Sequence, residues 1–334
     1  MTQPRSIAFA TETELSPTVT VAVPVLDEAG HLEAVLASIA AQTYPFIMEV
    51  LVVDGGSRDH TREIALTYPD LPVRVVDNPH KIQAAALNIA LRQARGEVFV
   101  RVDGHCVLEH DYVERCVDTL TMSGAALVGG GMTPRAGGAV QRGIASAMAS
   151  RFGAGPARFH TGGAPGWVDT VYLGAFPTAL GRRVGGYAED VGVNEDAELA
   201  IRLGRVGGVW YDPQIRSHYT PRSDVPSLAR QFFRYGRSRA LTVRRHPKSI
   251  RPRQLVAPAL VVALLSPWRR PVLAAYAVAV VGRTAVETAR DRKCAPGFAA
   301  SLPTMHLSWG AGFLWGLVYQ KTRPPSWCKR PSVP

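Results

Sequence analysis

Short apolar runs, each ended by acidic residues and followed by a helix-like segment, constrain the fold of this chain most. Residues 18–25 form an uncharged β-branched run, which is typical of a strand buried on both faces of a parallel sheet. Similar strand-like runs cover residues 49–53 and 97–102, and apolar residues recur at helical spacing between them. Strands that alternate with helices predict an α/β fold with a mostly parallel central sheet.

The following segments extend this pattern. Additional strands are expected at residues 73–76, 126–130, 168–173 and 208–211. Helices are expected at residues 32–39, 83–94, 111–122, 140–150 and 196–203, and one more is expected after Asp59 and Thr61, which can cap it.

Positive charge is concentrated at one end of the chain. The 334 residues include 38 basic and 27 acidic ones, but from residue 228 onward 19 basic residues accompany only two acidic ones. These basic residues adjoin the longest apolar runs, which favours an anionic membrane surface as the partner. Nucleic-acid binding would need a recognition motif, and the sequence has none. We therefore expect membrane lipids, and no nucleic acid, among the partners.

Acidic residues follow three of the predicted strands: Asp27 with Glu28, then Asp54, then Asp103. In an open α/β sheet, ligands bind beyond the carboxyl ends of the strands. Each acid could instead cap a helix or lie in a solvated turn, yet three at one sheet edge favour a ligand site. Glycines directly after Asp54 let the backbone approach a ligand, and its carboxylate can bind the hydroxyls or base of a nucleotide.

Asp103 and His105 are candidate metal ligands. They lie one residue apart at a strand end, so their side chains point the same way in an extended segment. A carboxylate with an imidazole suits Mn²⁺ or a similar divalent ion, and a diphosphate would complete the coordination shell. The alternative is a capping aspartate beside a surface histidine.

Two helical segments carry further candidates. Asp196 lies on the first turn of a helix, where the helix dipole keeps it ionised, so it is either a catalytic base or a plain N-cap. Gln231, Arg234 and Tyr235 fall within one helical turn. Arg234 could pair with a diphosphate, or the segment could be a basic amphipathic helix on lipid.

Taken together, these motifs resemble those of family 2 glycosyltransferases, and most closely the bacterial succinoglycan-biosynthesis type. The resemblance extends over about residues 19–318, nearly the whole chain. The motifs that carry it are Pro24–Glu28, Val53–Asp59, Asn88, Val102–His105, Val168–Phe176, Asn194–Leu199, Gln231–Gly236 and His306–Phe313. Each motif alone is weak, but their order and spacing together are specific.

The resemblance implies a Rossmann-like GT-A fold, a nucleotide-diphosphate sugar donor, a divalent metal (Mn²⁺ or Mg²⁺) and inversion at the anomeric carbon. The donor would be bound by Pro24, Asp27, Glu28, Asp54, Asn88, Asp103, Gln231, Arg234 and Tyr235. Asp103 and His105 match the D-x-D metal motif, with histidine in the second place. Asp196 matches the catalytic base, with Glu195 and Gly174 on the acceptor side.

The predicted activity is transfer of a sugar to a hydroxyl of a saccharide acceptor, lipid-linked in a membrane setting, in polysaccharide or glycolipid synthesis. Tyr235 replaces the tryptophan of the Q-x-x-R-W element, which disfavours a processive polymerase. The alternatives are a polyprenyl-phosphate sugar synthase and a non-catalytic membrane-bound nucleotide-sugar-binding protein. A nucleotidyltransferase is disfavoured, because Pro24–Gly30 contains no lysine.

The predicted organisation is an N-terminal tail (1–17), a GT-A catalytic domain (18–227), a basic amphipathic segment (228–254), membrane-associated helices (255–320) and a basic tail (321–334). Four scattered cysteines and the lack of an apolar leader fit a cytosolic catalytic domain.

We place this domain on the cytoplasmic side of the cell membrane. The apolar runs Leu255–Leu265 and Val272–Gly282 have eleven residues each, whereas a span needs about 20. Gly297–Tyr319 is long enough to cross. We favour interfacial or re-entrant helices, with one or two true spans as the alternative.

Overall fold

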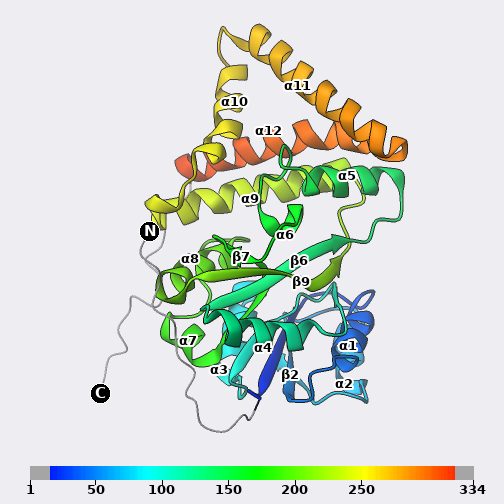
Figure 1. Ribbon diagram of the computed structural model, residues 1–334, viewed down its shortest axis with the longest axis vertical. Helices are drawn as coiled ribbons and strands as arrows, with labels where there is room; N and C mark the ends of the chain where they lie inside the picture. The colour runs from blue at the N-terminus through cyan, green and yellow to red at the C-terminus, as the bar shows by residue number, and fades with distance from the viewer. Residues whose placement is uncertain (1–15, 320–334) are drawn as a thin grey trace.

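The computed structural model describes residues 16–319 of the chain. An α/β body lies below a layer of long helices, and a helical hairpin projects beyond that layer (Figure 1). Residues 1–15 and 320–334, which include the predicted basic tail and nearly all of the N-terminal tail, lie outside the described residues.

The central sheet is mixed, with the strand order β3-β2-β1-β4-β8-β6-β9-β5, and β7 pairs with β9. Its first four strands are parallel, as predicted: β1 (Val19–Val25), β2 (Ile47–Asp54), β3 (Val73–Asp77) and β4 (Val98–Arg101). The others are β5 (Cys106–Leu108), β6 (Leu127–Pro134), β7 (Gly166–Trp167), β8 (Tyr172–Pro177) and β9 (Val209–Tyr219). β8 runs antiparallel to both β4 and β6, so only part of the sheet follows the parallel pattern.

The strand expected at residues 168–173 is present only from Tyr172 onward, and residues 168–171 are not in a strand. Gly166–Trp167 pairs with β9, and β8 begins only at Tyr172. Leu173 and Gly174, within β8, both have positive φ angles, of 56° and 99°. This left-handed backbone redirects the chain, which a run of apolar letters does not reveal.

Helices cover both faces of the sheet. One face packs against α1 (Leu32–Ala40) and α4 (Tyr112–Ser123), and the other against α3 (Gln83–Gln93), α7 (Thr178–Arg183) and α8 (Glu195–Gly207). Shorter elements are α2 (Thr61–Thr67) and α6 (Arg158–Thr161). The result is a three-layer α/β/α body whose interior consists of Val, Leu, Ile and Ala side chains.

A separate helical layer lies on this body (Figure 1). Its members are α5 (Ala139–Ala149), α9 (Val225–Arg245) and α12 (Ala295–Tyr319), which bury a third apolar cluster that includes Ile144, Phe232 and Phe298. Glycines allow α9 and α12 to approach closely. A Cβ atom on Gly236 would lie 2.0 Å from the carbonyl oxygen of Trp309, so no side chain fits there.

The projecting hairpin consists of α10 (Val256–Leu264) and α11 (Arg269–Arg290), seen at the top of Figure 1. Among the described residues, α11 alone is long and apolar enough to cross a membrane, and only 6% of its apolar window is buried. The sequence had pointed to Gly297–Tyr319 instead. That segment forms α12, whose inner face packs on α9 and α5, whereas α11 is a 22-residue helix that continues past Arg283, where the apolar run Val272–Gly282 ends.

Gly236→Ala should destabilise the helical layer, because the added methyl group meets backbone atoms that cannot move aside. Overpacking of this kind costs about 1–3 kcal/mol. Gly282→Ala on α11 is the matched control, since its Cβ would meet nothing within 4 Å. It should leave stability unchanged or raise it by up to about 1 kcal/mol. Thermal unfolding of both variants in detergent makes the comparison; equal midpoints would contradict the close contact of α9 and α12.

Candidate active site

A cavity of about 2450 Å³ opens at the carboxyl ends of β1 and β4 and continues beneath α10 and α11. It unites most of the side chains expected from the sequence: Glu28, Asp103, His105, Glu195, Asp196, Gln231, Arg234 and Tyr235. Five other expected residues are not among those that line it: Pro24, Asp27, Asp54, Asn88 and Gly174.

Arg101, at the end of β4, lies at the centre of the polar site, and the sequence analysis did not select it. Its Nε donates to Oδ1 of Asp103 at 2.8 Å, and its Nη1 lies 3.2 Å from Oε1 of Glu195. Arg101 is 5% exposed, so both ion pairs are buried. The sequence did contain information that could have identified Arg101 as a site residue. Arg101 is a charged residue in an apolar strand, and it lies two positions before Asp103, so both side chains are on the same side of the strand.

The site holds more negative than positive charge. Burial raises the pKa of Glu195 to about 7, against the attraction of Arg101, and Asp196 beside it contributes to the rise. Burial likewise raises the pKa of Asp196. Burial also favours the neutral form of Asp103, but the nearby guanidinium of Arg101 outweighs it, so the pKa of Asp103 lies below its ordinary value. Three carboxyl groups thus share one guanidinium, which suits a further cation.

Asp103 and His105 fit a divalent metal by the chemistry of their donor atoms. Nδ1 of His105 lies 2.9 Å from Oε1 of Glu28, and this contact raises the pKa of His105. The arrangement leaves the other ring nitrogen for a metal, with Glu28 orienting the ring. Gln83 donates to Oδ1 of Asp103 at 2.9 Å, while Oδ2 has only a 3.4 Å contact with Arg101.

The protein supplies few metal ligands of its own. Within residues 16–319, no group of three or more His, Cys, Asp or Glu side chains is placed to hold a metal ion. Asp103 and His105 would therefore provide two ligands to such an ion, with the remaining positions left to diphosphate oxygens and water.

The acids after β1 and β2 shape the loops beside the cavity. Oδ1 of Asp54 accepts hydrogen bonds from the backbone N–H of Ser57 at 3.0 Å and from its hydroxyl at 2.6 Å. Asp27, with a positive φ of 55°, accepts from the backbone N–H of Arg58 at 2.7 Å. Their binding of a nucleoside remains a prediction.

Asn88 has structural contacts on both ends of its amide. Its side-chain nitrogen donates to the backbone oxygen of Tyr187 at 2.9 Å and to Glu189 at 2.8 Å, and its oxygen accepts from the N–H of Tyr187 at 2.7 Å. Pro24 is buried in β1, and Gly174 adopts a positive φ in β8. The donor and acceptor roles expected for these three residues remain predictions.

Asp196 lies in the first turn of α8 and faces the cavity. The N-cap of this helix is Asn194, so the reading of Asp196 as a plain N-cap is wrong. The backbone N–H of Ala197 donates to Oδ1 of the Asp196 carboxylate at 2.6 Å. Oδ2 therefore remains available to a substrate hydroxyl.

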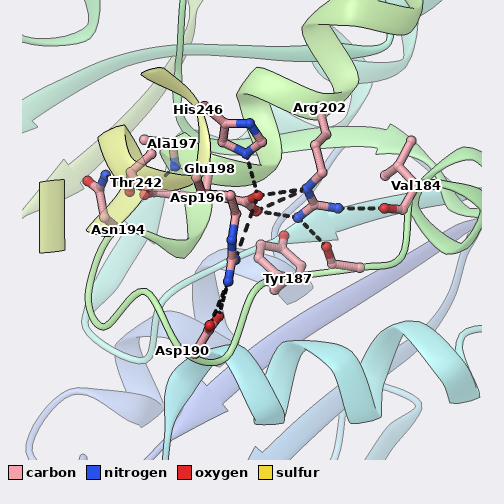
Figure 2. A network of polar contacts seen from close by, with 12 residues as sticks. Val184, Tyr187, Asp190, Asn194, Asp196, Ala197, Glu198, Arg202, Thr242 and His246 are labelled. Atoms are coloured by element: carbon pink, nitrogen blue, oxygen red, sulfur yellow. Dashed lines mark hydrogen bonds and ion pairs between the residues drawn. The ribbon is translucent and has the colours of Figure 1, made fainter. Parts of the chain in front are cut away.

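A buried ionic network holds α8 in place (Figure 2). Glu198 is fully buried and accepts hydrogen bonds from Arg202 at 3.0 Å, while Nε2 of His246 lies 2.8 Å from it. Burial alone would raise the pKa of Glu198, but the bonds from Arg202 outweigh it and hold the pKa below its usual range. Arg245, beside His246, pairs with Asp190 at 2.7 Å. The network ties α8 and the loop before it to the end of α9.

The predicted diphosphate-binding residues share α9. This helix begins at Asp224, whose side chain accepts from the N–H of Ser227 at 2.7 Å. Gln231 donates to the hydroxyl of Tyr235 at 2.9 Å, and burial raises the pKa of that tyrosine. Arg234 is exposed and lines the cavity, so its guanidinium is free to meet an anionic ligand.

The sequence has clear relatives. The model for glycosyl transferase family 2 matches residues 20–183. The succinoglycan biosynthesis protein ExoA of Rhizobium meliloti is 34% identical over 306 residues, which cover 88% of this chain and 93% of that protein. Glycosyltransferase AglE of Haloferax volcanii is 36% identical over 138 residues, or 39% of this chain and 45% of that protein.

Solved structures are similar over almost the whole chain. The mannosyltransferase PcManGT of Pyrobaculum calidifontis, in complex with GDP-Man and Mn²⁺, has a TM-score of 0.62 at 22% identity, covering 92% of this chain and 89% of that one. TarS of S. aureus, in complex with UDP-GlcNAc, has a TM-score of 0.53 at 15% identity, covering 91% and 93%. At such identities the likeness shows the fold alone, and it confirms the predicted GT-A fold.

Arg101→Gln should destabilise the protein, because it leaves Asp103 and Glu195 buried without their cation. Removing one partner of a buried ion pair costs about 3–5 kcal/mol. Arg115→Gln is the matched control: Arg115 pairs with Asp111 on α4, and its side chain is 42% exposed. A surface pair contributes at most about 1 kcal/mol. Denaturant unfolding should show a lower free energy of unfolding for Arg101→Gln than for Arg115→Gln. Equal values would contradict the claim that Arg101 stabilises the buried carboxylates of Asp103 and Glu195.

Proposed function

The chain belongs to glycosyltransferase family 2, and we propose that it transfers a sugar from a nucleotide-diphosphate donor to a hydroxyl of a lipid-linked saccharide, with inversion. One observation carries the proposal. A single cavity contains the carboxylate–imidazole pair of Asp103 and His105, the carboxylate of Asp196, and the inner faces of α10 and α11. The proposed donor site, the proposed base and the proposed route to the membrane therefore open into the same cavity.

The donor end of the cavity suits a diphosphate. Asp103 and His105 would hold the divalent ion, which when bound neutralises charge on the departing diphosphate. Arg234 is placed to donate to phosphate oxygens, a charge-assisted contact that becomes stronger as negative charge develops. The solved relatives bind GDP-Man with Mn²⁺ in one case and UDP-GlcNAc in the other, which supports a donor of this class.

Asp196 is the proposed base. The acceptor hydroxyl loses its proton to Oδ2 of Asp196 as its oxygen bonds to the anomeric carbon, and the bond from that carbon to the diphosphate breaks on the opposite face. A base works best when its pKa is near the operating pH, and burial raises the pKa of Asp196 in that direction. Glu195, held by Arg101, is the proposed positioning group on the acceptor side.

A hydroxyl acceptor explains this base better than a phosphate acceptor does. A polyprenyl-phosphate sugar synthase uses an acceptor that is already anionic and needs no strong base. The desolvated carboxylate of Asp196 would then serve no purpose and would repel the phosphate. A non-catalytic binding protein would have no need of it either.

Asp196→Asn should lose transfer by about 10²–10⁴-fold, because an amide cannot accept the proton. Binding of UDP or GDP with Mn²⁺ should be unchanged in this variant, and EDTA should weaken it equally in variant and wild type. Asp118→Asn is the matched control, since Asp118 is exposed on α4, across the sheet from α8. Calorimetry and a turnover assay with several nucleotide sugars give the readouts. If the variant transfers sugar within a few-fold of the wild-type rate, Asp196 is not the base. If EDTA does not weaken nucleotide binding, the proposal of a metal ion at this site is wrong.

The helical hairpin is the proposed membrane contact. Large apolar side chains on it are exposed, including Leu265 at 85%, Trp268 at 72% and Val278 at 73%. Exposed apolar patches of this kind mark a membrane or partner surface. Arginines at both ends of α11 suit anionic headgroups. The proposed placement of the catalytic body is the cytoplasmic side of the cell membrane.

Fractionation of cells that produce the full chain tests this placement. We expect the protein in the membrane fraction, with release by detergent but not by high salt, because apolar contacts are insensitive to screening. Val278→Glu with Val281→Glu, both on the exposed side of α11, should shift it toward the soluble fraction. Wild-type protein that stays soluble at low salt in the presence of lipid would contradict the membrane assignment.

A further inference from the structure

A cluster of basic residues lines the cavity beyond the base. Its members are Arg239 of α9, Lys248 of the short helix Pro247–Ser249, and Arg251 and Arg253 at the helix Pro252–Leu255. We call these four residues the cationic cluster. They are not part of the donor motifs, and the proposed chemistry does not use them.

The cationic cluster has little opposing charge. Of the acidic residues that line the cavity, four lie around the proposed metal site and base, and Asp169 is the one that lies here. Asp169 pairs with Arg251 at 2.6 Å. Burial lowers the pKa of Arg239, and the nearby charges of Arg251 and Arg253 lower it further against the attraction of Asp169. Four positive charges against one negative charge leave a net charge of 4 − 1 = +3.

Arg239 also has an unused donor. One terminal nitrogen donates to the backbone oxygen of Ser249 and, at 3.1 Å, to the side-chain oxygen of Gln254. Its Nε is buried and has no hydrogen-bond partner among residues 16–319. A buried N–H without an acceptor is unfavourable, so an anionic oxygen at this place would satisfy it.

The position of the cationic cluster along the cavity suggests what it binds. Gln231, Tyr235 and Arg239 are four residues apart on α9, so they share one face, and each step advances about 6 Å. The cluster therefore begins one turn beyond the predicted diphosphate-binding residues. From its end, α10 rises away from the body toward α11 (Figure 1), and Val256 and Leu260 of α10 continue the cavity wall.

We propose that the cationic cluster binds the diphosphate that links the acceptor saccharide to its lipid, while α10 and α11 contact the lipid chain. The inference rests on the proposed function, since it locates the anionic part of the lipid-linked acceptor. A diphosphate diester carries two negative charges, which the net charge of the cluster matches. The saccharide then extends from the cluster toward Asp196, and the hydrocarbon extends along the exposed apolar hairpin.

The test uses the full chain in detergent micelles, with farnesyl diphosphate as the probe. Wild type should bind farnesyl diphosphate at least tenfold more tightly than farnesol or inorganic diphosphate, because both the anion and the chain contribute. Arg239→Gln with Arg251→Gln should weaken this binding at least tenfold. Arg290→Gln is the matched control, an exposed arginine at the far end of α11, and it should have no effect.

A second variant covers the case in which the first fails to fold. Lys248→Gln with Arg253→Gln alters two exposed side chains and should also weaken farnesyl diphosphate binding at least tenfold. Binding of UDP or GDP with Mn²⁺ should be unchanged in both variants, since the donor end is intact.

Three results would overturn the inference. If the wild-type protein binds farnesyl diphosphate no more tightly than farnesol, the cationic cluster does not bind the anion. Parallel loss of nucleotide binding would assign the cationic cluster to the donor. Loss of binding to anionic vesicles, with farnesyl diphosphate binding unchanged, would assign it to lipid headgroups. The proposed transferase activity fails separately, through a wild-type protein without nucleotide-sugar turnover or through an active Asp196→Asn variant.

Discussion

The buried guanidinium of Arg101 is the interaction on which the polar site depends. It joins Asp103, at the end of a central strand, to Glu195, at the start of α8. Without it, neighbouring carboxyl groups would lie together at a largely buried position, and they would become neutral or move apart. The metal motif and the base motif therefore keep their relative positions because one cation serves both.

The same helix is held at its other side by Glu198. Through Arg202 and His246, this buried carboxylate connects α8 to the loop before it and to the end of α9. The helix that carries the proposed base is thus bonded to the end of the helix that carries Gln231, Tyr235 and Arg239. One consequence is that the proposed base and the cationic cluster lie on helices joined by buried hydrogen bonds, although they come from distant parts of the sequence.

Local patterns predicted much of this correctly. The parallel strands and the helices between them follow from hydrophobic periodicity. Asp103 and His105 were selected from their spacing at a strand end, and Asp196 from its place in the first turn of a helix. All three line one cavity, and their roles remain predictions. The antiparallel course of β8 was not predicted, because the direction of a strand depends on which neighbours it meets. The sequence also did not indicate α11 as the helix long and apolar enough to cross a membrane, because Arg283 ends the apolar run Val272–Gly282.

The sequence by itself determined the family, the α/β fold, the charge of the C-terminal third and most of the side chains around the cavity. These properties depend on residue order and spacing along one chain. Only the tertiary structure decided that Arg101 bridges two motifs, that Asn88 supports a loop, and that Arg239 has a buried N–H without an acceptor. The reason is physical: ion pairing, burial and an unmet hydrogen bond depend on distances between segments far apart in sequence, and only folding brings those segments together.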